Sequence, residues 1–340
     1  MLSNLKSTLL ISSFALFSLS AFADKSELFS VNGTIDAKIP LKIKNNNINS
    51  NYDVDALNGF KTIKLMSIQP TNAMIQKNRT AMAKLIQEGG ERDYSNGITS
   101  FDNSFNAVDL GMNGVDVLDQ GSHGTCVTFA TTAALDAKLQ LNDYIDQQCI
   151  LALNKYLGND YWNGADNATQ VVDPLKKYGI IKKGNCFGDS YADPSQSISP
   201  SKYTTRSTKK FTNNLNYKYF GKADLDILKA ALDNGNRVVI GTALADIKGN
   251  KVSVNGFDVK VDDGDFNQGG LWACKQPGDN TNYCPEKPDA GHEVIVTGYD
   301  DGQKLLKIRN SWSSDAGDNG NFYMTYAFFN AMAMDQTVIK

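Results

Sequence analysis

The stretch Gln120-Gly121-Ser122-His123-Gly124-Thr125-Cys126 decides the fold, because it is a glycine-rich approach to a helix that begins at a cysteine. The run of alanine and threonine after it predicts a helix from Cys126 to Leu141. Cys126 then lies in the first helical turn, where unpaired backbone N–H groups and the helix dipole favour a negative charge. Such a position raises thiolate character. Position alone leaves two interpretations open, an activated thiol and a buried structural thiol.

A nucleophilic thiol needs a base beside it, and the chain has two histidines, His123 and His292. His123 precedes Cys126 on the loop that enters the same helix, so their side chains diverge more readily than they meet. His292 is distant in the sequence, and a fold can bring it across a cleft to the thiol. The sequence therefore favours His292 as the base, with a strand-end histidine satisfied in the core as the alternative.

Two further motifs follow towards the C terminus, and with the first stretch they carry a resemblance. They are Gly291-His292-Glu293-Val294-Ile295-Val296-Thr297-Gly298-Tyr299 and Asn310-Ser311-Trp312. Together they resemble papain-like (C1-type) cysteine peptidases over about residues 107–340. The resemblance implies Cys126 as the nucleophile, His292 as its base and Asn310 as the residue that orients the base. It also implies Gln120 as an oxyanion donor and Trp312 as a shield for the His–Asn hydrogen bond.

The entry to the predicted helix departs from the family signature. His123-Gly124-Thr125-Cys126-Val127 stands where the family has Cys-Gly-Ser-Cys-Trp. His123 cannot form the disulfide of that first cysteine, so we expect it to be a local hydrogen-bonding substitute, with a pH-dependent influence on Cys126 as the alternative. Tyr161-Trp162-Asn163-Gly164 resembles the family's substrate-binding strand, which implies that Gly164 binds substrate backbone.

The chain has five cysteines, so at least one thiol is unpaired within the chain. Cys149 and Cys186 flank a stretch that resembles the family's second helical-domain disulfide, and this implies the pair Cys149–Cys186. Cys274 and Cys284 bracket a Gly-Asp-Asn turn and could close a small loop. These pairings leave Cys126 free. The wide spacing of Cys274 and Cys284 disfavours zinc, and we expect no metal or organic cofactor.

The first residues, 1–23, read as an export signal. Lys6 is followed by a mostly apolar run, and Ala21-Phe22-Ala23 supplies a cleavage site. An uncleaved membrane anchor is the alternative. After cleavage we expect no membrane association and a secreted or periplasmic protein, where disulfides persist. The short signal and the few cysteines fit a bacterium. A net charge of -3 without a basic run gives no case for a nucleic-acid partner.

Residues 24–104 precede the family-like region, lack cysteine and occupy the place of a propeptide. Asn32-Gly33 predicts a hairpin turn within residues 28–43, and residues 61–68 predict a strand. Thr71 or Asn72 can cap a helix that Gly89-Gly90 ends. Residues 91–106 are polar and predict an exposed linker where processing occurs. We expect a small, atypical hairpin-plus-helix prosegment that blocks the cleft; an accessory domain that stays attached is the alternative.

In residues 105–340, predicted helices at 126–141, 171–178 and 222–233 precede predicted strands at 237–241, 293–299, 304–309 and 322–326. Helices first and strands afterwards indicate an α+β protein. The resemblance implies a papain-like two-domain fold, with a helical half, a β-barrel-like half and the active site in the cleft between them. The expected function is a secreted cysteine peptidase, made as a zymogen, that hydrolyses a polypeptide through a thioester. The alternatives are a catalytically silent protein that binds peptides or host proteins, and an acyltransferase.

Overall fold

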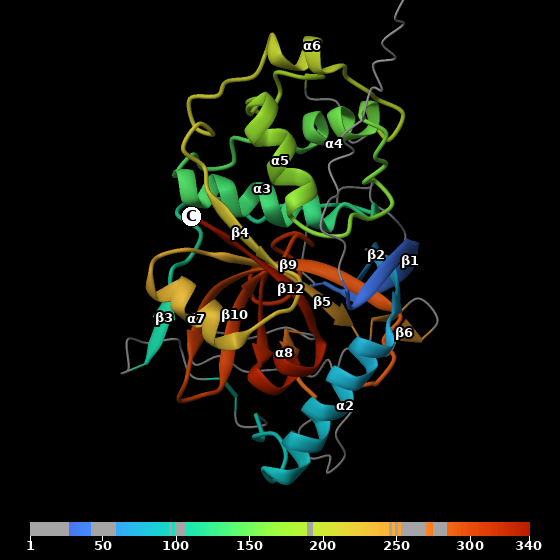
Figure 1. Ribbon diagram of the computed structural model, residues 1–340, viewed down its shortest axis with the longest axis vertical. Helices are drawn as coiled ribbons and strands as arrows, with labels where there is room; N and C mark the ends of the chain where they lie inside the picture. The colour runs from blue at the N-terminus through green and yellow to red at the C-terminus, as the bar shows by residue number, and fades with distance from the viewer. Residues whose placement is uncertain are drawn as a thin grey trace, which may run out of the picture.

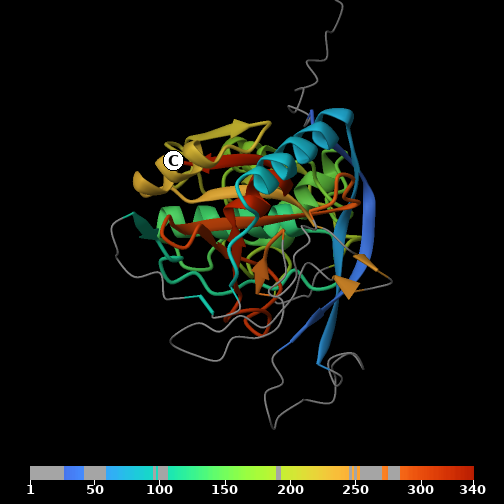
Figure 2. The same cartoon turned by 90° about the horizontal axis from the view of Figure 1, so that it is seen from below.

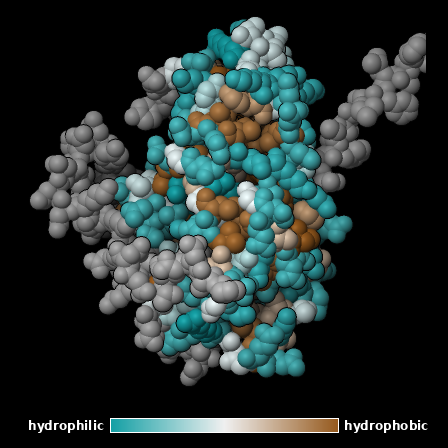
Figure 3. All heavy atoms as spheres, turned by 90° about the vertical axis from the view of Figure 1, so that its left-hand side faces the viewer, coloured by the Kyte–Doolittle hydropathy of each residue, from teal (hydrophilic) through white to brown (hydrophobic). Residues whose placement is uncertain are grey.

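The protein is described by a computed structural model that covers residues 27–41, 59–94, 97–98, 106–188, 193–244, 247–248, 251–252, 270–274 and 284–340. The signal peptide predicted at residues 1–23 lies outside the described residues. On the side of the molecule seen in Figure 3, hydrophobic residues form separate patches between hydrophilic ones. Among the described residues, no helix is long and apolar enough to span a membrane.

Four helices gather at one end of the molecule and form the helical half (Figure 1). They are α3 (Cys126–Leu139), α4 (Gln147–Tyr156), α5 (Thr169–Tyr178) and α6 (Pro200–Thr204). The small residues of α3 bury almost its whole circumference, so it packs as a central helix against the sheet. It ends two residues before the predicted Leu141, because Gln140 takes a left-handed conformation with φ 55°. Gly179, with φ 88°, ends α5 as predicted.

The other half is built on a sheet whose strand order is β4-β12-β5-β9-β2-β1-β7-β6, with further strands paired off this path. The central strand β9 (Ala290–Asp300) is buried along its entire length. The remaining strands of this half are β3 (Ala107–Asp109), β4 (Tyr217–Phe220), β5 (Val238–Leu244), β6 (Ile247–Lys248), β7 (Lys251–Val252), β8 (Leu271–Trp272), β10 (Leu305–Arg309), β11 (Asn321–Thr325) and β12 (Ala333–Ile339). Two helices, α7 (Leu225–Asp233) and α8 (Tyr326–Met332), pack on it.

The segment before residue 104 contributes a long hairpin to the same sheet (Figure 2). It consists of β1 (Phe29–Pro40) and β2 (Phe60–Pro70), paired antiparallel. The turn predicted at Asn32-Gly33 is wrong, because β1 runs through it as one strand. A shift of register between Val31 and Thr34, with Gly33 at φ 111°, shows that the glycine serves a bulge. Strand β2 also pairs with β9, where Met66 lies opposite Gly291.

The helix α2 (Asn72–Gln87) holds this segment to the sheet half. Thr71 caps it by accepting a hydrogen bond from the Met74 N–H at 3.4 Å. The Lys77 ammonium donates to the carbonyls of Asn330, at 2.8 Å, and Ala331, at 3.0 Å, at the end of α8. A cation at a helix C-terminus is favoured by the dipole, so α2 and α8 are joined by charge as well as by packing.

The described part of the linker is exposed only in part, since Arg92, Asp93 and Asn106 are exposed and two apolar side chains are not. Tyr94 is 3% exposed and Ile98 is fully buried. Both belong to a small apolar cluster, whose other members are Leu271, Ala273, Leu305 and Tyr323. The Tyr94 hydroxyl donates to the Gln303 carbonyl at 2.7 Å. These two side chains are enough to hold the stretch against the apolar cluster. The average composition of residues 91–106 is polar and therefore did not reveal them.

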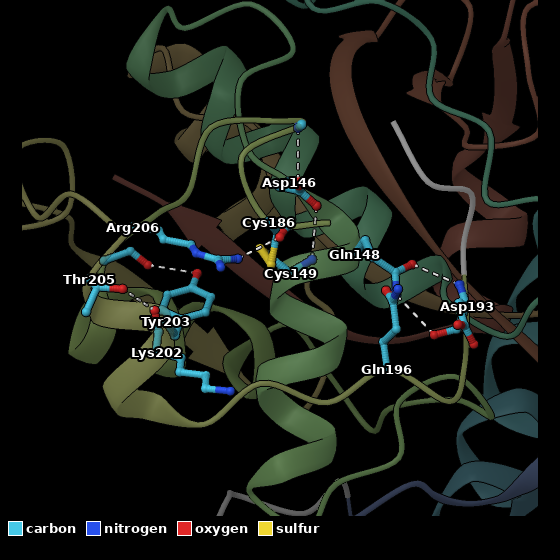
Figure 4. Close-up of a disulfide and its surroundings, with 12 residues drawn as sticks. Asp146, Gln148, Cys149, Cys186, Asp193, Gln196, Lys202, Tyr203, Thr205 and Arg206 are labelled. Carbon is cyan, nitrogen blue, oxygen red and sulfur yellow. Dashed lines mark hydrogen bonds between the residues drawn. A yellow bond between two sulfur atoms is a disulfide. The ribbon is translucent and has the colours of Figure 1, made fainter. Parts of the chain in front are cut away.

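Two disulfides join Cys149 to Cys186 and Cys274 to Cys284, and the Cys126 thiol is free. The resemblance implied the first pair, and the second is the small loop that the sequence suggested. Figure 4 shows the first disulfide at the start of α4. Asp146 accepts from the Cys149 N–H at 3.0 Å and from the Gly184 N–H at 3.1 Å, so one carboxylate joins the two segments that the bridge connects.

Replacing both Cys149 and Cys186 by serine is expected to lower the free energy of unfolding by about 4 kcal/mol, because the bridge closes a long loop. The cysteines are 37 positions apart in the first bridge and 10 in the second, so the matched Cys274→Ser/Cys284→Ser variant should lose less, about 3 kcal/mol. Urea unfolding measures both losses. Non-reducing peptide mapping that finds Cys126 in a bridge would contradict this pairing.

Candidate active site

The free thiol of Cys126 lies at the first residue of α3, fully buried. It receives a hydrogen bond from the backbone N–H of Glu293 on β9. The cap residue Thr125 makes no side-chain hydrogen bond to the helix, and the first-turn N–H groups of Cys126 and Val127 also donate to the sulfur. The thiol therefore occupies the helix start that the sequence predicted, and it faces the strand that carries His292.

His292 and Asn310 are brought together by the pairing of β9 with β10. The His292 Nε2 lies 2.8 Å from the Asn310 Oδ1, and both residues are buried. The same oxygen accepts the Ser311 N–H at 2.7 Å, which fixes its orientation. Because an amide oxygen only accepts, Nε2 carries the proton of the neutral ring and Nδ1 keeps its lone pair. Among the described residues Nδ1 has no hydrogen-bond partner, so it is the ring nitrogen able to take a proton.

Two tryptophans enclose the imidazole. Trp312 stacks on His292 with ring centroids 4.6 Å apart and an interplanar angle of 26°. Trp272 approaches the edge of the same ring at 6.4 Å and also contacts Trp312. Trp272 was missed by the sequence reasoning, since no motif surrounds it. Its only signal is that it is one of three tryptophans in the chain.

Gln120 is oriented by the motif that supplies Asn310. The Ser311 hydroxyl donates to the Gln120 Oε1 at 2.7 Å, which leaves the amide nitrogen to point away. That nitrogen donates to the carbonyls of His123, at 2.9 Å, and Lys64, at 3.4 Å. It borders a cavity of about 760 Å³ lined also by Trp162. Ser311 is the second positioning residue that sequence reasoning missed, although it lies inside a recognised motif.

His123 packs edge-on against Trp162, with ring centroids 4.9 Å apart at 79°. Within the described residues, this ring makes an aromatic contact and no side-chain hydrogen bond, so the hydrogen-bonding role expected of it is wrong. Burial and the nearby Lys64 lower its pKa. The contact joins the loop before Cys126 to the segment of Gly164. The backbone reinforces it, since the Gly124 N–H donates to the Trp162 carbonyl at 3.0 Å.

The hairpin lies close to the main chain of both halves, next to Cys126 and next to His292. A Cβ placed on Gly124 would collide with Thr34, and one placed on Gly164 would lie 2.9 Å from Val31 and 3.3 Å from Met66. A Cβ on Gly291, beside His292, would lie 2.9 Å from Ile68. Three glycines around the site thus let the hairpin approach the main chain closely. The expected substrate contact at Gly164 is occupied by the chain's own strands.

Burial sets the charge state of the covered site. Desolvation raises the pKa of Cys126 to about 12, and the Glu293 carboxyl adds to the rise. Desolvation lowers the pKa of His292 to about 4, against a smaller opposing effect of the Asn310 hydrogen bond. Between these values the thiol and the imidazole are both neutral. The thiol and the imidazole are therefore held in an uncharged form away from water.

A scan against models of known protein families found no match. The chain is similar to cysteine proteinase 1 of Entamoeba histolytica, with 26% identity over 291 residues covering 81% of each chain. It is also similar to cysteine proteinase 2 of that organism, with 26% identity over 295 residues covering 82% of this chain and 81% of the relative. The solved structure of digestive procathepsin L 3 of Tenebrio molitor larval midgut superposes with a TM-score of 0.50, at 20% identity, covering 73% of each chain.

The fold is therefore the papain-like α+β fold, in which a helical half and a sheet half meet at the site. The relatives and the fold support an enzyme of the cysteine-type peptidase class.

The covered His292 is expected to make the uncut chain sensitive to acid. Its ordinary pKa is 6.5 and its pKa in the folded chain is about 4, so below pH 6.5 the unfolded chain binds a proton that the folded chain excludes. Folded stability should therefore fall from pH 6.5 towards pH 4, by about 2.5 kcal/mol at pH 4.5.

Unfolding of the uncut chain at pH 7 and pH 4.5, compared with His292→Gln, measures this contribution. Because the variant cannot titrate at this position, its loss between the two pH values should be smaller by that amount. Equal losses in both proteins would contradict the assignment.

Proposed function

We propose that the chain is an exported cysteine peptidase made as a zymogen, with Cys126 as nucleophile, His292 as base and Asn310 as orienting residue. The single observation that supports this most is the site itself. A free thiol at a helix start faces a strand whose histidine is oriented by Asn310 and has Nδ1 unoccupied. A buried imidazole with one nitrogen held by an amide and the other free fits proton transfer better than a structural role.

The proposed chemistry uses each of these groups, and His292 acts in more than one step. His292 Nδ1 takes the thiol proton, and the thiolate attacks the peptide carbonyl carbon. The Gln120 amide and the backbone N–H of Cys126 stabilise the oxyanion, each donor being worth about 3 kcal/mol in such sites. The imidazolium then protonates the leaving amine, which departs with the C-terminal part of the substrate. Water hydrolyses the thioester with His292 as base and restores the thiol.

Residues 24–104 are proposed to act as an inhibitory prosegment. The Lys64 carbonyl takes a hydrogen bond from the Gln120 amide, so the hairpin engages the group proposed to stabilise the oxyanion. Its strand β2 also extends the sheet at Gly291, next to the base. The aligned structure of Tenebrio molitor is itself of a procathepsin, which agrees with a zymogen. Export is proposed from the signal-like residues 1–23 and fits the two disulfides.

The intact mass of the protein after exposure to an epoxide thiol inhibitor, under mild reduction, tests the function. The uncut chain should label slowly, because its thiol is neutral and covered. A chain cut between residues 91 and 106 should gain one adduct at Cys126, faster by about tenfold or more, as the hairpin is released.

Two variants control this test. His292→Ala should abolish labelling of the cut chain, because it removes the base that ionises the thiol. Lys77→Ala should speed labelling of the uncut chain, because it removes the contact of α2 with the end of α8. An unlabelled Cys126 in every form would show instead a catalytically silent protein that binds its ligand at this site.

A further inference from the structure

Two buried carboxyl groups lie together in the sheet beside the proposed active site. Glu293 on β9 and Asp335 on β12 flank Gly241 of the intervening strand β5. A Cβ placed on Gly241 would lie 2.7 Å from the Asp335 Oδ1 and 3.1 Å from the Glu293 Oε2. Each residue is 1% exposed. The absence of a side chain at Gly241 therefore leaves room for both carboxyls over the same point of the sheet.

The positive charge that such a pair needs is missing from the described residues. Asp335 accepts from the Gly241 N–H at 3.1 Å and from the Tyr219 hydroxyl at 3.4 Å, while Glu293 Oε2 has no hydrogen-bond partner in the part of the chain that the structure describes. No described lysine or arginine forms an ion pair with either group. Buried carboxyls without a cation are costly, and desolvation raises the pKa of both.

The charge of Asp166, two residues after Gly164 in the segment that leads to α5, adds to the rise in the pKa of Asp335. Its carboxylate accepts from the Gln170 side chain at 3.2 Å. Within the described residues, no three His, Cys, Asp or Glu side chains are grouped as metal ligands. Two carboxyls that meet over one point of the sheet suit an organic cation, whose several N–H donors can reach both.

The hairpin places the side chain of Met66 in this region of the sheet. Met66 is fully buried, with its Cε 3.4 Å from a Cβ placed on Gly291 and its Cγ 3.3 Å from one placed on Gly164. Gly291 and Glu293 are two residues apart on β9 and therefore share a face of the sheet. The unbranched side chain of Met66 thus spans the two halves, next to the acidic pair, and brings no charge to it.

We propose that Glu293 and Asp335 form an acidic subsite that binds an arginine or lysine side chain of the substrate in the place held by Met66. The inference rests on the proposed function and adds the substrate class. The stem of either side chain matches that of methionine, and its charged end extends further, towards the carboxyls. Arginine fits best, since its planar guanidinium donates to two carboxylates at once. Met66 is uncharged, so it leaves the two carboxyls without a cation. The prosegment therefore binds here without an ion pair, which suits its later release.

Fluorogenic tetrapeptides that carry arginine, lysine or uncharged norleucine at one position at a time test the subsite on the cut protein. One position before the scissile bond should prefer arginine over norleucine by about tenfold or more, the scale of a hydrogen bond to a charged group. Asp335→Asn and Glu293→Gln, which keep the side-chain shape, should each reduce this ratio severalfold while norleucine peptides are still cleaved.

Asp136→Asn is the matched control, since Asp136 is also a buried carboxyl but lies on α3, bonded to the N–H groups of Tyr144 and Ile145. It should leave the ratio unchanged. The same peptides are assayed as protectors of Cys126 against the epoxide, so that the preference can be read without turnover. If the peptides are cleaved, or protect Cys126, without a preference for arginine or lysine, the proposed subsite is contradicted and the proposed peptidase function is not. Failure of Cys126 to label overturns both.

Discussion

The hydrogen bond between His292 and Asn310 is the constraint on which the site depends. It exists because β9 and β10 are paired, and it fixes which ring nitrogen is free to face the thiol. The two tryptophans keep water from this bond, and Ser311 couples the same motif to Gln120. The groups proposed as base, orienting amide and oxyanion donor are therefore positioned by one strand pair and the turn after it, while the thiol comes from the other half.

The hairpin and the site depend on each other through main-chain contacts. Small residues at Gly124, Gly164 and Gly291 let the strands β1 and β2 lie against both halves, and pairing with β9 aligns them. The same burial that covers the thiol also neutralises it, because desolvation opposes the ionisation of Cys126 and of His292 alike. Burial of the site therefore excludes other molecules from it and also keeps Cys126 and His292 uncharged.

The sequence predicted most of what short-range chemistry controls. The position of Cys126 at a helix start, the strand of His292 and the cap at Thr71 all follow from local patterns. Three features required the tertiary structure. Asn32-Gly33 forms a bulge because a distant strand continues the pairing, His123 contacts a tryptophan from another loop, and the pair Glu293–Asp335 joins residues 42 positions apart. Nothing in a linear pattern reveals which side chains meet across a sheet, and Trp272 was missed for the same reason.

The proposed prosegment has a consequence for how long its inhibition would last. In the uncut chain the hairpin and the site share a chain, and tethering of this kind corresponds to an effective concentration on the order of millimolar. After the proposed cut, the same strands would be held by strand pairing and side-chain contacts alone, as a separate ligand whose occupancy follows mass action. Release would then depend on the total concentration of the protein, and dilution into a larger volume would favour it.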